Sequence, residues 1–144
     1  MTASASQPTV RLPLPRLGAA VALGTLAGAG LAALVWMLVG EEGATRAVML
    51  ATIVCLAAGV AGLVPAWLAG ERSVMAATAS VIAGTTLRMA AAVGLGWAVY
   101  SAQGLEKLPF WTALLAAQAG ALAAETKVAA GVGRRLGAGE KSGS

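Results

Sequence analysis

Two oppositely charged side chains stand in segments that are otherwise apolar, and they are the residues best placed to do chemistry. Arg88 lies near the middle of an apolar segment at residues 75–100, and Glu125 lies near the end of another at residues 108–127. A charge at the centre of a membrane-length helix costs about 2.5–3.5 kcal/mol on insertion scales. Such residues almost always face a partner or a polar cavity, so Arg88 and Glu125 are the candidate site.

Helix geometry predicts that these two side chains can meet. At about 1.5 Å per residue, Arg88 and Glu125 lie roughly 18 Å and 25 Å from the same edge of an antiparallel helix pair. Side chains lean toward the N-terminus of their own helix, so the two groups lean toward each other. We therefore expect an ion pair that fixes the two helices against each other. Thr85 and Gln118 are its expected secondary partners. In the alternative, Arg88 extends alone to the aqueous interface and Glu125 pairs with Lys127 or water.

Small residues recur at a spacing of four along several of the apolar segments. Gly84 and Gly96 belong to one such ridge on the segment that carries Arg88, and Gly24 and Gly28 form a GxxxG motif earlier in the chain. Small residues at this spacing let helix backbones approach closely in lipid. We expect these four glycines to be helix-packing positions, although a chain this rich in alanine and glycine also produces such spacings by chance.

Composition places the chain in a membrane. Of its 144 residues, 58% are hydrophobic and only 11% are charged, whereas a soluble domain carries about 25% charged residues. Most of the charges gather near both ends and in short segments, and long apolar stretches separate them. This pattern predicts an all-α polytopic membrane protein, a bundle of four transmembrane helices. The expected helices span about 17–39, 47–68, 75–100 and 108–127.

Flanking segments and topology follow from the polar residues. Residues 1–16 are expected to form a disordered N-terminal arm, residues 17–128 the transmembrane domain, and residues 129–144 a disordered basic tail. Basic residues outside the spans divide into Arg11, Arg16, Arg72, Lys127, Arg134, Arg135 and Lys141 on one side, and Arg46 and Lys107 on the other. The positive-inside rule then predicts a multi-pass membrane protein with both termini in the cytoplasm.

Missing residue types exclude several kinds of chemistry. The sequence contains no His, Asp or Asn, and its one cysteine, Cys55, lies in an apolar run. Ser-His-Asp and Cys-His catalysis therefore have no base, and zinc sites built on histidine cannot form. We expect no enzyme activity, no catalytic residue, no metal and no cofactor, and we expect Cys55 to act as a small hydrophobe. The net charge of +4 sits mainly near the termini, so it indicates topology and predicts no nucleic-acid partner.

The second half of the chain resembles a known family. Residues 83–89 (AGTTLRM), and the run from residues 108–110 (LPF) to 124–126 (AET), resemble the ATP synthase protein I family. Its members are small four-helix membrane proteins that are often encoded beside the subunits of bacterial F-type ATP synthases. The length, the short loops and the predicted position of both termini also fit. The first two predicted helices are similar only in hydropathy.

This resemblance implies a location in the bacterial cytoplasmic (inner) membrane and a non-enzymatic accessory role in assembly or stability of the c-subunit ring of the synthase. Arg88 and Glu125 are the positions at which it would be tested, since their pair could hold a groove for a c-subunit hairpin. A magnesium carrier or channel is the second interpretation, because a homo-oligomer could bring several Glu125 side chains into one ring. A small structural membrane protein of an unrelated family is the third. The expected partners are the lipid bilayer, c-subunits and further copies of the chain.

Overall fold

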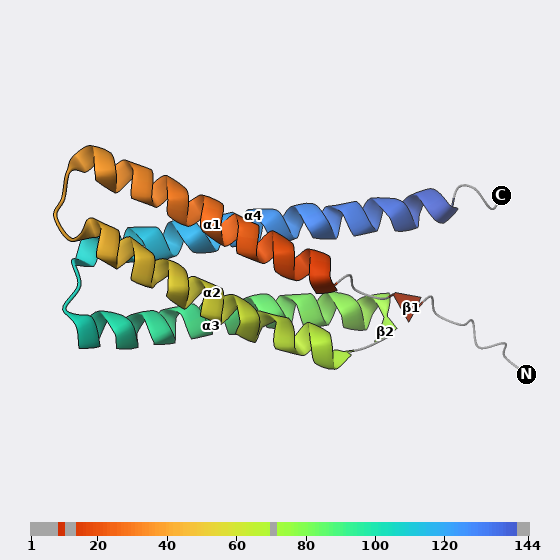
Figure 1. Ribbon diagram of the computed structural model, residues 1–144. Coiled ribbons are helices and arrows are strands. Elements are labelled where there is room, and N and C mark those ends of the chain that lie inside the picture. The colour runs from red at the N-terminus through yellow and green to blue at the C-terminus, as the bar shows by residue number, and fades with distance from the viewer. Residues whose placement is uncertain (1–8, 11–13, 70–71, 141–144) are drawn as a thin grey trace, which may run out of the picture.

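Four long helices make up nearly all of the structure. The computed structural model describes residues 9–10, 14–69 and 72–140. Its elements are α1 (Leu14–Val39), α2 (Ala44–Ala69), α3 (Val74–Gln103), α4 (Lys107–Glu140) and the two-residue strands β1 (Thr9–Val10) and β2 (Arg72–Ser73). The helices alternate in direction along an elongated bundle (Figure 1). We call the end with the α1–α2 and α3–α4 connections the loop end, and the opposite end the terminal end.

The predicted fold class is confirmed as an all-helical bundle of membrane type. Helices α1, α2 and α3 are each long and apolar enough to cross a bilayer. Their outer faces carry large apolar side chains such as Met37 and Leu38, the latter 81% exposed. Soluble monomers rarely expose contiguous apolar surface on this scale. Helix α4 is less apolar than the other three, so its passage through the membrane remains a prediction from the sequence.

The N-terminal boundary of the bundle needs correction. Helix α1 begins at Leu14, so residues 14–16 belong to a helix and not to a disordered arm. Pro15 is tolerated there because the first turn of a helix does not use its amide hydrogens. Thr9 and Val10 pair antiparallel with Ser73 and Arg72, which ties the arm to the α2–α3 connection. The rest of the predicted arm, residues 1–8 and 11–13, lies outside the described residues.

The C-terminal boundary also needs correction. Disorder was expected from residue 129, but α4 continues to Glu140. The glycines of this stretch weaken a helix, yet extending an existing helix avoids the cost of nucleation, which is the unfavourable step. Residues 141–144 lie outside the described part of the chain.

Glycines with positive φ make the two turns at the loop end. Gly40 follows α1 with φ 74°, and Gly104 follows α3 with φ 56°. The left-handed conformation is open to glycine at little cost and is a common helix terminator. The amide of Gly40 donates to the carbonyl of Trp36 at 3.1 Å, which closes α1. These connections are short, and they make neighbouring helices antiparallel.

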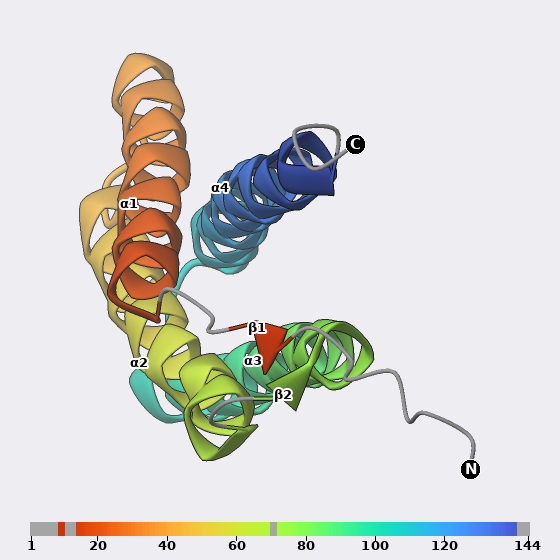
Figure 2. The same cartoon turned by 90° about the vertical axis from the view of Figure 1, so that its right-hand side faces the viewer.

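The helices pack unevenly. Helix α1 lies along α4 and α3 lies along α2, and these are the two most extensive contacts. Helix α2 also contacts α1 and α4, whereas α3 and α4 contact each other only sparsely. Figure 2 shows the consequence at the terminal end, where α3 and α4 stand apart on either side of the bundle. Helix α3 is therefore attached to the rest mainly through α2.

The glycines predicted to be packing positions lie where helices cross. A Cβ on Gly24 would lie 2.9 Å from Ala124 Cβ and would overlap the Gly120 carbonyl, and one on Gly28 would overlap the Ala116 carbonyl. Gly96 faces Leu114, whose Cδ1 would be 2.7 Å from an added Cβ. Real Cβ atoms are not found this close to other atoms, so α1 meets α4 almost backbone to backbone.

The second close crossing joins α2 to α3. A Cβ on Gly84 would overlap the carbonyl of Gly62, and a Cβ on Gly62 would lie 2.9 Å from Arg88 Cβ. Dispersion between closely packed atoms is the main attraction between helices in lipid, because lipid is as apolar as the side chains. This crossing therefore holds α3 on α2 and seats Arg88 beside it.

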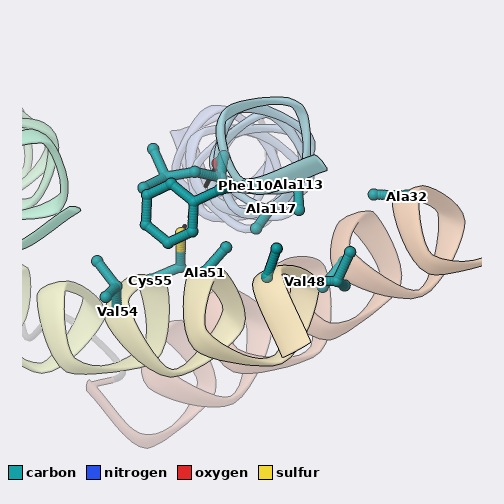
Figure 3. Packing of buried hydrophobic residues seen from close by; sticks show 11 residues of the cluster. Ala32, Val48, Ala51, Val54, Cys55, Phe110, Ala113 and Ala117 are labelled. Atoms are coloured by element: carbon teal, nitrogen blue, oxygen red, sulfur yellow. Dashed lines mark hydrogen bonds between the residues drawn. The ribbon is translucent and has the colours of Figure 1, made fainter. Parts of the chain in front are cut away.

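A core of mostly small side chains fills the half of the bundle nearer the loop end. It is built from α1, α2 and α4, with Phe110 as its one aromatic side chain that is fully buried. Figure 3 shows the Phe110 ring above Cys55, with Ala51, Ala113 and Ala117 filling the space between the helices. The ring fills space that alanines cannot reach, so the helices can stay close around it.

Overpacking either crossing should separate the helices. We expect Gly24→Val to lower the free energy of unfolding by about 1–3 kcal/mol, because its side chain has no room against α4. Gly30→Val on the same helix is the matched control, since nothing lies within 4 Å of its added Cβ. Denaturant titration in mixed micelles measures both variants. Equal stability of the two would contradict the close α1–α4 crossing.

Candidate functional site

Arg88 is buried at mid-height in the bundle. It lies roughly 20 Å from either end of α3 at about 1.5 Å per residue, and only 1% of it is exposed. Its stem passes Gly62, where any larger residue would collide with it. The glycine crossing therefore supplies the room that the arginine stem occupies between α2 and α3.

The structure brings Arg88 and Glu125 together. Arg88 Nη1 lies 2.6 Å from Glu125 Oε1, and the two side chains are 2% and 13% exposed. Thr85 Oγ1 lies 3.3 Å from Glu125 Oε2 and 3.0 Å from the Val81 carbonyl, so its one proton can be donated to either oxygen. Both carboxylate oxygens thus have a neighbour on α3, and Thr85 has the supporting role expected of it.

The hydrogen-bonding capacity of the guanidinium is largely unused. The contact with Glu125 has the distance of an ion pair but not the angle of a hydrogen bond, and Nε and Nη2 have no hydrogen-bond partner among the described residues. A buried donor without an acceptor costs about 1–3 kcal/mol. Charge attraction therefore holds Arg88. Its Nε–Nη2 edge is suited to bidentate binding of a carboxylate, and this edge has no hydrogen-bond partner among the described residues.

Gln118 does not take the expected place beside Arg88. Its Nε2 lies 3.7 Å from Cys55 Sγ, and its Oε1 has no partner among the described residues. It precedes Glu125 by two helical turns, roughly 10 Å along α4, so it lies nearer the loop end than the carboxylate and contacts α2 there. The prediction of a direct Gln118–Arg88 contact was wrong because it compared depth alone and ignored which helix lies opposite.

Cys55 is the polar contact that sequence reasoning missed. Its thiol is buried, accepts from Gln118 and donates to the Leu114 carbonyl, with both sulfur distances at 3.7 Å. The sequence spacing could have indicated that Cys55 is buried between helices, because Cys55 and Gly62 are seven residues apart and therefore share a face of α2. This buried face carries polar contacts at two levels, one at Cys55 and one beside Arg88.

The sequence had predicted that the ion pair fixes α3 and α4 against each other. The structure shows the ion pair, but the two helices are not in broad contact. Helices α3 and α4 are only sparsely in contact, and α3 rests on α2. The pair from Arg88 to Glu125 is therefore one of the few links across a sparse boundary. Glu125 is the more exposed partner, so the boundary opens on its side.

A hydrogen bond and a cluster of aromatic rings link the helices at the loop end. Trp36 Nε1 donates to Thr112 Oγ1 at 2.8 Å, which links α1 to α4. Tyr100 packs against Phe110 and Trp111, with ring centroids 6.0 Å and 5.9 Å away. Aromatic and amphipathic residues of this kind collect where a membrane meets water. They fix the end of α3 to the start of α4, so α3 and α4 meet near the loop end and diverge toward the terminal end.

Comparisons of the chain with family models, with curated proteins and with solved structures give no match. Among the described residues, no three His, Cys, Asp or Glu side chains gather into a group that could hold a metal ion. Arg88, Glu125 and Thr85 are the polar side chains that give this site its chemistry. Arg88 is a buried cation beside Glu125, and its guanidinium has N–H donors without acceptors among the described residues. Such a group is suited to binding an acidic group.

Breaking the ion pair from one side should be costly. We expect Glu125→Ala to lower the free energy of unfolding by about 3–5 kcal/mol, because it leaves Arg88 buried without a counter-charge. The double variant Arg88→Met/Glu125→Leu should recover most of that loss, since it removes both charges together. A double-mutant cycle in mixed micelles measures the coupling. Strictly additive losses would show that the two charges do not interact.

Proposed function

We propose that the chain is a non-enzymatic integral membrane accessory protein that assists assembly or stability of the membrane sector of an F-type ATP synthase, at its c-subunit ring. The observation that carries the proposal is the buried Arg88, whose Nε and Nη2 have no hydrogen-bond partner among the described residues. Water is scarce at this depth in a bilayer, so a protein group is the natural acceptor. A docking membrane helix can bring one.

The arrangement of helices supports docking at this place. Helices α3 and α4 are only sparsely in contact, and Glu125 bridges them with part of its side chain exposed. A helix that enters between them would meet Glu125 first and Arg88 behind it. A carboxyl group on that helix could then bind the open Nε–Nη2 edge in place of Glu125 or beside it. The resemblance of residues 83–89 and 108–126 to ATP synthase protein I makes the c-subunit the proposed occupant.

Co-purification tests this role. We expect the tagged full-length protein to retain c-subunits from its host membrane, and Arg88→Met/Glu125→Leu to retain at least tenfold less because it lacks the charges that dock. The double variant is used because it should still fold. Lys107→Met removes an exposed lysine at the loop end and should retain c-subunits as the unaltered protein does.

Two results would contradict the proposal. One is unchanged retention of c-subunits by the double variant, and the other is their absence from the unaltered protein. Magnesium uptake into proteoliposomes that is lost in Glu125→Gln would favour the carrier interpretation in its place. If neither c-subunits nor magnesium respond, a structural role in an unrelated family is the better account.

The proposed location is the bacterial inner membrane with the terminal end in the cytoplasm. We expect Glu42→Cys, in a Cys55→Ala background, to react in intact cells with a maleimide that cannot cross membranes. Ser142→Cys should react only after the cells are permeabilised, because its end of the bundle carries most of the basic residues. The reverse labelling pattern would show the opposite orientation.

A further inference from the structure

Two adjoining hollows open at the loop end, on either side of the first turns of α2. One lies between the end of α1 and the start of α2, has a volume of about 290 Å³ and is lined in part by Glu41. The other lies between the start of α2 and the end of α3, has a volume of about 550 Å³ and is lined in part by Arg46 and Gln103. Thr45 and Met49 line both hollows, so a single bound molecule can reach from one into the other.

Opposite charges stand in the two hollows. Arg46 Nη2 donates to Gln103 Oε1 at 2.7 Å, which holds the guanidinium over the larger hollow and uses one of its five N–H donors. Glu41 is half-buried in the smaller hollow. Glu106 lies beside Gly43 at the rim of the larger one, where its Cγ would be 3.8 Å from an added Cβ. A ligand here must satisfy one cation while flanked by carboxylates.

The larger hollow changes from polar to apolar along the helix. Below Arg46 it is lined by Met49, Leu50 and Ile53, and Met49 and Ile53 are exposed. From Arg46 to Ile53 the distance along α2 is roughly 10 Å. Because α2 is long and apolar enough to span a bilayer, this direction leads from the membrane surface into the hydrocarbon. A phospholipid has the same order of groups.

We propose that the two hollows bind one phosphatidylethanolamine molecule. Its phosphate lies against Arg46 and Thr45, its ammonium reaches Glu41, and an acyl chain follows Met49 and Ile53. Phosphatidylglycerol has no cation for Glu41 and adds net negative charge near Glu106. Phosphatidylcholine carries a cation but has no N–H to donate to a carboxylate. This inference needs the loop end to lie at a membrane surface, and it is independent of any role at the ATP synthase.

Native mass spectrometry of the full-length protein can test the preference. The detergent-solubilised protein is titrated with phosphatidylethanolamine, phosphatidylglycerol and phosphatidylcholine that share the same acyl chains. We expect one phosphatidylethanolamine to be retained, and about tenfold weaker retention of the other two lipids, the ratio that one lost charge-assisted contact would give. Equal retention of the three lipids would overturn the proposal.

Matched variants assign the two charged contacts. Arg46→Gln should weaken phosphatidylethanolamine binding about tenfold, whereas Lys107→Gln, which removes a charge at the same end outside both hollows, should leave it unchanged. Glu41→Gln should remove the preference over phosphatidylcholine, whereas Glu42→Gln should keep it. Thermal unfolding of each variant checks that the bundle is intact. If Arg46→Gln binds like Lys107→Gln, or Glu41→Gln like Glu42→Gln, the proposed pose is wrong.

Discussion

The attraction between Arg88 and Glu125 is the constraint on which the rest of this bundle depends. Coulomb attraction grows as the surrounding medium becomes less polar, but so does the cost of removing each charge from water. With the Arg88 side chain 2% exposed, the pair is tolerable only if both charges stay together. The two charges come from different helices, so burial of either one fixes how α3 and α4 lie relative to each other.

That requirement explains why glycines surround the pair. Gly62 and Gly84 bring α2 and α3 close enough to enclose the stem of Arg88, and Gly24 and Gly120 do the same for α1 and α4. Side chains any larger would widen both crossings and admit lipid or water beside the charges. The alanine-rich core follows the same logic, because small side chains lose little rotamer entropy when they are packed.

The sequence allowed the four helices to be predicted, and the ion pair as well, because charges are rare in these segments. Arg88 and Glu125 were conspicuous for that reason, and Thr85 followed from its place one turn away. Which helix each face would meet was harder. Gln118 was matched to Arg88 by depth, yet equal depth does not reveal which helix a side chain meets, and the structure places it against Cys55 on α2. The sparse α3–α4 boundary was not foreseen either, because small-residue ridges occur on every helix and do not specify their partners.

Helix α4 is longer than its neighbours, and this has a mechanical consequence. Its 34 residues make a rod of roughly 51 Å at 1.5 Å per residue, against a hydrocarbon thickness of about 30 Å. Figure 1 shows it continuing past the end of α1 at the terminal end. If α4 crosses the bilayer as the sequence predicts, about 20 Å of the rod would stand in the aqueous phase as a stalk. A tilt of the stalk would act as a lever on Glu125, which sits near its base.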